Sequence, residues 1–252
     1  MAATAALITS IPARARLSPS DLFLPASSLT SSYTLTLTLA ALWTGASLAL
    51  NSVAGPGVDL SLATRIISPT IVAIDTETAI GVHEDTHSRV SGLPKQFAHR
   101  LETQALESGA FPIANFLSAL NAPTRARVGA APGKLRLVLV ASSANGAALT
   151  SSQLSDLRVF TGARVVHALT DSQVAGAITQ THLFDYRVES GDAHYGAPLS
   201  SVEIKLVDKE NHKTTDEEAR GEVVVEGPAV AGGKAKTGLL GRWRQDGCLT
   251  LV

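Results

Sequence analysis

One run of residues near the middle of the chain restricts the possible fold more than any other feature. Residues 134–142, KLRLVLVAS, are nearly continuously apolar and include β-branched valines. Such a run is typical of a strand buried on both faces of a parallel sheet, because a half-exposed strand alternates apolar and polar residues. Thr150 or Ser151 then begins a helix that ends at Gly162, and ARVVHAL, residues 163–169, is a second buried strand. Strand, helix and strand at this spacing predict an α/β layer with a parallel sheet.

The other segments divide into two parts. Upstream, short strands are predicted in DLFLPA, ASLAL and TIVAID, together with a helix that runs to Trp43 and a short helix capped by Asp59. From Gly191 on, PLSSVEIKLVD, GEVVVEGPAV and CLTLV are strands with alternating faces joined by polar turns. We therefore expect an α/β fold. Residues 1–190 form a partial doubly wound, largely parallel sheet with flanking helices, and residues 191–252 add an antiparallel β module, a distorted barrel, to the same domain.

Composition and charge exclude several classes of protein. Hydrophobic residues make up 45% and charged residues 17%, which is typical of a globular chain and not of a disordered one. The 21 basic and 22 acidic residues leave no basic excess to neutralise the phosphates of a nucleic acid. Cys248 is the only cysteine, which rules out an intramolecular disulfide and a cysteine-based metal cluster. We expect an intracellular protein, in the cytoplasm or at the surface of an organelle membrane, that is not secreted.

Two segments are similar to targeting or membrane sequences. Residues 1–20 contain two arginines, many small residues and no acid, as in some transit peptides, but they also fit a first helix that ends before Pro12, which we favour. Residues 22–58 carry no formal charge, and residues 33–50 approach the ~20 apolar residues that a membrane-spanning helix needs. The Thr and Ser residues and the glycine within them favour a helix buried in the core. Peripheral contact with a membrane stays open.

One short motif matches a metal-site pattern. Residues 83–87, HEDTH, fit the H-E-x-x-H pattern of zinc proteases. That chemistry needs both histidines on one face of a stable helix, a third ligand and a dry wall behind them. Gly81 lies just upstream, and Asp85 and Thr86 are poor helix formers. The sequence therefore predicts a solvated loop and no zinc.

Three further enzyme signatures do not occur in the sequence. GPAVAGGKAKTG lacks the Gly-Lys-Ser/Thr spacing of a phosphate-binding P-loop, because Ala235 follows Lys234. No G-x-S-x-G elbow of a serine hydrolase is found. A dinucleotide-binding α/β protein is also poorly supported, because the chain has no G-x-G-x-x-G followed by an acid.

The remaining pattern is a set of segments in a fixed order. RLSPSDLFLPASSLTSSYTLTLTLAALWTGASLAL is followed by LRLVLVASSANGAALTSSQLSDLRVFTGARVVHALTDSQVAGAI, and then by YGAPLSSVEIKLVD, ARGEVVVEGPAV and KTGLLGRWRQDGCL. Together they resemble the adenylate-forming superfamily: acyl-CoA synthetases, the adenylation domains of peptide synthetases, and luciferases. The resemblance covers nearly the whole chain and corresponds to a middle portion of the family's large N-terminal domain. It implies that ATP and a carboxylate give an acyl-adenylate and pyrophosphate, after which the acyl group moves to a thiol, usually coenzyme A.

The resemblance also implies a nucleotide site. ASSANG resembles the family's turn after a parallel strand, where small residues lie against adenine; the implied positions are Ser142, Ser143, Ala144 and Asn145. HALTD stands where the family has Tyr-Gly-x-Thr-Glu, so it implies a nucleotide-binding stretch made of His167, Ala168 and Leu169. By the same match Thr170 would bond the α-phosphate and Asp171 would approach magnesium. These two are the implied catalytic residues, and Asp171 is the implied metal ligand.

A third motif lies near the end of the chain. Thr237 and Gly238 match the first two residues of the family's Thr-Gly-Asp loop, whose aspartate accepts both ribose hydroxyls. Leu239 stands in the place of that acid, so hydrogen bonds worth roughly 1.5–3 kcal/mol each are lost. The Asp246-Gly247 pair that follows predicts a β-hairpin.

The implied function is that of an AMP-binding, acyl-CoA ligase-like protein acting on a fatty acid or a similar hydrophobic carboxylate. ATP or AMP, magnesium and coenzyme A are the implied cofactors and co-substrate. The family's phosphate loop, hinge and C-terminal lysine domain have no counterpart in these residues. We therefore expect a truncated chain without measurable ligase turnover, a fragment or a pseudoenzyme. The alternative is a non-catalytic remnant of the fold that binds a partner protein or a lipid.

Overall fold

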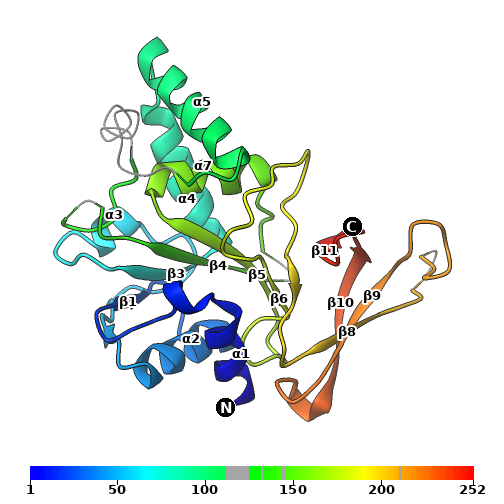
Figure 1. Ribbon diagram of the computed structural model, residues 1–252. Helices are drawn as coiled ribbons and strands as arrows, with labels where there is room; N and C mark the ends of the chain where they lie inside the picture. Colours follow the sequence, from blue (N-terminus) through cyan, green and yellow to red (C-terminus); the bar gives the residue numbers. More distant parts are fainter. Residues whose placement is uncertain (112–124, 132, 144–145, 210–211) are drawn as a thin grey trace.

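The computed structural model describes residues 1–111, 125–131, 133–143, 146–209 and 212–252 (Figure 1). Within these residues the helices are α1 (Ala2–Ser10), α2 (Ser32–Trp43), α3 (Leu60–Ala63), α4 (Thr76–Arg89), α5 (Leu93–Glu107) and α7 (Ser151–Thr161), with 3-10 turns η1 (Ala13–Ala15) and η3 (Ala231–Gly233). The strands are β1 (Leu22–Pro25), β2 (Ser47–Leu48), β3 (Ile71–Asp75), β4 (Leu137–Ser143), β5 (Arg164–Thr170), β6 (Thr179–Gln180), β7 (Ala197–Pro198), β8 (Glu203–Val207), β9 (Arg220–Glu226), β10 (Lys234–Trp243) and β11 (Leu249–Leu251).

The first sheet has the strand order β2-β1-β3-β4-β5-β6-β7. Its first five strands are parallel to one another, and β6 and β7 are antiparallel additions at one edge. From β1 the chain moves to β2 on one side and then returns to β3 on the other. The order of strands therefore reverses between β1 and β3, as at the switch point of doubly wound sheets, where ligands bind outside the carboxyl ends of the strands. The predicted α/β fold class is confirmed.

Helices cover both faces of this sheet (Figure 1). Successive residues of each strand point to opposite faces, so Leu139 of β4 packs with Leu7 of α1 and Leu37 of α2 in one core cluster. Val140 belongs to a second cluster, which includes Leu154 of α7. This two-sided burial is why the central strand is apolar without interruption.

Helix α7 has the ends that the sequence predicts. The Thr150 hydroxyl accepts a hydrogen bond from the Gln153 backbone N–H at 3.2 Å, and the Gln153 side chain accepts one from the Thr150 backbone N–H at 3.0 Å. This capping box satisfies two backbone donors at the start of the helix. Gly162 follows the last turn with φ of 62°, a left-handed conformation that glycine adopts without steric cost.

The N-terminal region forms two packed helices. Residues 2–10 are helix α1, as favoured above, and the helix packs on α2. Helix α2 is only half buried: Tyr33 and Leu37 face the core, but Leu39 and Trp43 are exposed. A helix packed in the core is therefore present, as preferred above, but it has one face covered and the other exposed. No helix of the described residues is long and apolar enough to span a membrane.

The HEDTH motif lies in a helix, and the predicted loop was wrong. Helix α4 runs from Thr76 to Arg89 and contains residues 83–87. Its N-terminus is capped by Asp75, whose carboxylate accepts a hydrogen bond from the Thr78 backbone N–H at 2.8 Å. Buried residues such as Ala79 and Thr86 then fix one face of the helix on its neighbours. Tertiary packing thus overrides the weak helix propensities of Asp85 and Thr86.

The second sheet is curled and antiparallel, with the order β11-β10-β9-β8, as predicted for the C-terminal part. Its core joins the first sheet through Leu169, which packs in one cluster with Val223, Val225 and Leu249. Residues 234–243 form the strand β10, where the resemblance implies a loop. A register shift between Lys236 and Leu240 interrupts the pairing of β10 with β9. Strand β7 pairs with β6, and the boundary at residue 190 stays a prediction.

Candidate functional site

The two central motifs of the predicted site end side by side. Strands β4 and β5 are parallel neighbours, and their register places Ser142 opposite Leu169 and Ser143 opposite Thr170. The Thr170 hydroxyl donates a hydrogen bond to the Ser142 carbonyl oxygen at 3.0 Å. The described residues of ASSANG and HALTD therefore converge at the carboxyl edge of the sheet, which sequence alone does not show.

A small cavity opens at this edge and has a volume of about 180 Å³. Its walls come from the segments that follow β1, β3, β4 and β5, so it lies at the switch point of the sheet. The lining residues are Ser27, Ser28, Ser31, Pro56, Asp75, Thr76, Glu77, Ala141, Ser143, Gly146 and Thr170. Ser143 and Thr170 are the two predicted site residues that reach it.

Two of the lining residues carry a buried oxygen that is unpaired within the described part of the chain. One is the hydroxyl oxygen of Ser27, which follows β1 and whose backbone N–H donates to the Ala73 carbonyl of β3 at 3.1 Å. The other is Oδ2 of Asp75, whose second oxygen caps α4. Leaving such atoms unpaired costs free energy, and a group entering the cavity could supply the missing partners. Neither residue was predicted from the sequence, although the acid at the end of TIVAID follows a parallel strand, which is where ligands bind in such sheets.

Ser142 and His167 lie inside the molecule. The Ser142 hydroxyl is 2.7 Å from Nε2 of His167 and 2.7 Å from the Thr76 hydroxyl. Nδ1 of His167 lies 3.3 Å from the His194 carbonyl oxygen. The centroids of the His167 and Tyr195 rings are 4.6 Å apart. Burial lowers the pKa of His167 to about 4, so the ring is neutral at pH 7. In this structure His167 links strands and has no surface free for a base to stack on.

The other predicted residues are spread over several places. Ala168 is fully buried in the core cluster that contains Leu139, and Leu169 is fully buried in the cluster of the second sheet. Asp171 accepts a hydrogen bond from the Gln173 backbone N–H at 2.8 Å and does not line the cavity. Ala144 and Asn145 lie outside the described residues. Their roles stay predictions.

Thr237 and Gly238 lie at the interruption of β10 and do not line the cavity either. The Thr237 hydroxyl donates to the Val223 carbonyl oxygen at 2.8 Å and accepts from the Leu239 backbone N–H at 3.2 Å. Leu239 packs against the core of the second sheet. The threonine therefore stabilises an irregular strand, and a role in holding ribose stays a prediction.

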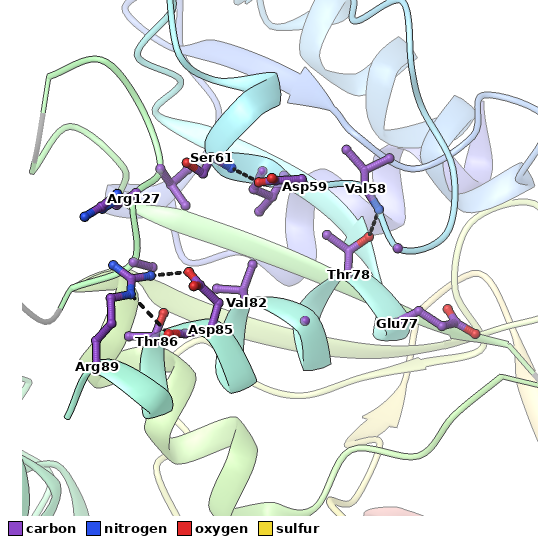
Figure 2. A pocket seen from close by; sticks show the side chains of 15 residues that line it. Val58, Asp59, Ser61, Glu77, Thr78, Val82, Asp85, Thr86, Arg89 and Arg127 are labelled. Carbon is purple, nitrogen blue, oxygen red and sulfur yellow. Dashed lines mark hydrogen bonds and ion pairs between the residues drawn. The ribbon is translucent and has the colours of Figure 1, made fainter. Parts of the chain in front are cut away.

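A larger cavity of about 440 Å³ lies beside the first, and Glu77 lines both. Figure 2 shows its wall on helix α4, where the Arg89 guanidinium pairs with the Asp85 carboxylate. On the opposite side the Asp59 carboxylate accepts from the Ser61 backbone N–H at 2.9 Å (Figure 2). Charged groups on both walls make this cavity a poor place for a hydrophobic acyl chain.

Several solved structures of the same architecture are coenzyme A synthetases or ligases. A search of the solved structures finds the unliganded O-succinylbenzoate coenzyme A synthetase (MenE) from Bacillus subtilis, with a TM-score of 0.61 and 17% identity over 100% of this chain and 44% of that chain. The same synthetase in complex with ATP and magnesium ion has a TM-score of 0.58 and 17% identity over 99% of this chain and 44% of that one. The anthranilate CoA ligase AuaEII in complex with anthranoyl-AMP has a TM-score of 0.60 and 17% identity, covering 99% and 42%. Identity this low shows a shared fold alone.

The family assignment comes from the sequence profile. No curated protein matches the chain. The chain spans less than half the length of the three solved chains just described. The family described as AMP-binding enzyme matches residues 2–233, which is most of the sequence. The chain therefore belongs to the family of AMP-binding enzymes.

Proposed function

We propose that this chain binds the phosphate end of the adenosine nucleotide used by an adenylate-forming acyl-CoA ligase, in the cavity at the carboxyl ends of β1, β3, β4 and β5. One observation carries the proposal: the cavity lies at the switch point and presents a buried, unpaired hydroxyl of Ser27 and a buried, unpaired oxygen of Asp75. A hydroxyl can donate to a phosphate oxygen, and a carboxylate can bind magnesium. We infer that the ligand is an adenosine nucleotide because the chain belongs to the family of AMP-binding enzymes.

The size of the cavity limits what it holds. A volume of about 180 Å³ is below the ~300–1,000 Å³ of pockets that enclose a whole small molecule. It suits a phosphate group with its metal better than a complete nucleotide. Ser143 is exposed and lines the cavity at the end of β4, whereas Ser27 lines it after β1. Hydroxyl donors from these separate strands would orient the phosphate, while the Thr170 hydroxyl already donates to the Ser142 carbonyl oxygen.

The lining also fits the magnesium ion that such ligases use. Magnesium prefers oxygen ligands and is usually bound through one or two carboxylates plus substrate phosphates. Asp75 and Glu77 are the carboxylates of the cavity. We infer that Asp75 is the stronger candidate ligand, in place of Asp171. When bound, the ion would neutralise phosphate charge, while the protein residues would position it.

Replacing Ser27 by Ala is expected to weaken the binding of ATP about tenfold or more, because a hydrogen bond to a charged group contributes about 1.5–3 kcal/mol. Stability should not fall, since the hydroxyl has no partner to lose in the described structure. Isothermal titration of both proteins with ATP and magnesium measures the difference. Ser201→Ala is the matched control, because its hydroxyl is equally buried and unpaired but lies outside the cavity. Equal affinities for wild type and Ser27→Ala would count against this site.

Replacing Asp75 by Asn is expected to remove the magnesium dependence of ATP binding while leaving AMP binding within about threefold. Asparagine caps a helix as well as aspartate does, so α4 should be preserved. The matched variant is Asp171→Asn, which also keeps its turn and should retain the magnesium effect. Titrations with and without magnesium separate the two. If only Asp171→Asn loses the magnesium effect, the magnesium ligand is Asp171, as the resemblance implies, and not Asp75.

The acid and the acyl acceptor are proposed from resemblance. We infer a hydrophobic carboxylate, with fatty acids expected from the sequence, and coenzyme A as the thiol. The similar solved proteins are named for O-succinylbenzoate and anthranilate, so aryl acids belong in the same assay. Release of pyrophosphate from ATP is measured with each class of acid. Turnover would support a ligase, whereas ATP binding without turnover for any acid would support the non-catalytic alternative.

A further inference from the structure

A cluster of histidines around one carboxylate joins helices α4, α5 and α7, which lie together in Figure 1. His83 and His87 come from α4, His99 from α5 and Asp156 from α7; we call these four residues the histidine cluster. Nε2 of His83 is 3.1 Å from Oδ2 of Asp156, and Nε2 of His99 is 3.0 Å from Oδ1. The His83 and His87 rings stack with centroids 5.5 Å apart. A potential ligand atom from each of His83, His87 and Asp156 lies within 4.8 Å of the others.

An aromatic side chain forms the wall behind the cluster. The Phe160 ring, which is 2% exposed, has its centroid 5.6 Å from that of His83, 6.5 Å from that of His87 and 5.0 Å from that of His99. His87 itself is exposed to solvent. The cluster therefore has an apolar floor and an open side through which an ion can enter.

The three requirements of a zinc-binding H-E-x-x-H motif are thus met. His83 and His87 are one turn apart on a stable helix, so they share a face. Asp156 supplies a third ligand and Phe160 the dry wall. The expectation of no zinc depended on a solvated loop at residues 83–87. Because these residues form a helix, that argument against zinc does not hold.

The charge of Asp156 is available to a cation. In the described ranges of the chain its ion-pair partners are His83 and His99, and no Lys or Arg pairs with it. Imidazole nitrogen together with a carboxylate oxygen is a ligand set that zinc favours. The His99 hydrogen bond holds the second oxygen of Asp156, as outer partners of metal ligands commonly do.

A second group of similar residues shows the contrast. Asp185, His194 and Cys248 also bring their ligand atoms within 4.8 Å of one another. There the Arg187 guanidinium lies 2.5 Å from the Asp185 carboxylate and 3.6 Å from the Cys248 sulfur. A cation thus already fills that position, so the histidine cluster is the better metal site.

We propose that the histidine cluster binds one zinc ion through His83, His87 and Asp156, with His99 positioning the carboxylate and water in the fourth position. The role is structural: the ion would tie α4 to α7. Neither cavity described above is lined by His83 or His87, so neither serves the motif as a substrate cleft. The site is separate from the nucleotide cavity and does not depend on it.

The test is a zinc titration of the purified full chain after removal of metal with a chelator. A chromophoric zinc competitor gives the affinity and stoichiometry, and a thermal melt gives the shift in Tm. We expect one zinc per chain and a higher Tm with zinc. His87→Ala should weaken binding more than about tenfold and abolish the Tm shift, because a ligand is lost. His87 is exposed, so this variant should fold. His182→Ala, which replaces an exposed histidine outside the cluster, should bind as the wild type does.

His99 is tested as a positioning residue. His99→Ala should weaken zinc binding by about 10–100-fold with unchanged stoichiometry, and His99→Gln, which can still donate to Asp156, should restore most of the affinity. Absence of saturable binding to the wild type at micromolar zinc would overturn the proposal. So would binding that is equally tight in His87→Ala, since the zinc would then sit elsewhere. Because zinc binding is measured without nucleotide, these results do not depend on whether the proposed nucleotide site exists.

Discussion

Acidification from about pH 7 to about pH 4 is expected to lower the free energy of unfolding by about 3 kcal/mol through His167 alone. Burial is the main cause, since it lowers the pKa of His167 from 6.5 to about 4 in the folded protein. The nearby charges of His194 and Arg158 act in the same direction, whereas the hydrogen bond to the His194 backbone opposes it. Between these two pKa values the unfolded chain binds the proton and the folded protein does not. The contribution of His167 to stability is therefore greatest above pH 6.5 and falls as the pH approaches 4.

Urea unfolding at a series of pH values measures this loss, in the presence of a chelator so that zinc does not contribute. His167→Gln has no group to protonate and should lose about 3 kcal/mol less than the wild type over the same range. Glutamine can still bond the Ser142 hydroxyl, which limits the cost at pH 7. His182→Gln replaces an exposed histidine and should keep the full loss. If His167→Gln and wild type lose stability in parallel, His167 is not the group that titrates.

Replacing Asp21 by Asn is expected to lower the free energy of unfolding by about 2–3 kcal/mol at pH 7. Asp21 is 4% exposed and lies just before β1. Its carboxylate accepts hydrogen bonds from Arg136 at 2.7 and 2.8 Å, from the Thr70 hydroxyl at 2.8 Å and from Ser18 at 2.9 Å. These contacts tie the start of β1 to the segments before β3 and β4. Asparagine keeps the shape but leaves the Arg136 guanidinium without its counter-charge.

The contribution of Asp21 should vanish at low pH. Burial raises the pKa of the carboxyl group, but the hydrogen bonds from Arg136, Thr70 and Ser18 outweigh it and lower the pKa from 3.8 to about 2. A carboxyl group with a lowered pKa stabilises the fold above its unfolded value, and the stabilisation is lost as the pH falls from about 4 to about 2. The gap between wild type and Asp21→Asn should narrow over that range. Asp59→Asn is the control and should be nearly neutral, because asparagine caps α3 equally well. A loss below about 1 kcal/mol at pH 7 would mean that Arg136 finds water instead.

Features that depend on neighbouring residues were predictable from the sequence. The apolar run through Leu139 marked β4, Thr150 or Ser151 marked the start of α7, and Gly162 marked its end. The order of the strands along the chain then favoured a parallel sheet. Each of these signals is local, because a cap or a buried strand imposes its requirement within a few residues.

The errors came from segments whose structure depends on distant contacts. Asp85 and Thr86 disfavour a helix, but α4 exists because Asp75 caps it and the sheet buries one face. The resemblance implies a loop at Thr237 and Gly238, yet pairing with β9 makes residues 234–243 an irregular strand. Propensity contributes tenths of a kcal/mol per residue, whereas packing contributes several times more per side chain.

The sequence by itself determined the fold class and the family, because the strand-helix-strand pattern and the order of motifs are written along the chain. Through the resemblance it also named Ser143 and Thr170 as site residues, although only the structure shows that their strands are neighbours. Only the tertiary structure decided which other groups share their cavity: Ser27 follows β1, Asp75 ends β3, and the pairing of these two strands at the reversal of strand order brings them together. The histidine cluster was likewise decided in three dimensions, since its members come from three helices and meet only when these pack against one another.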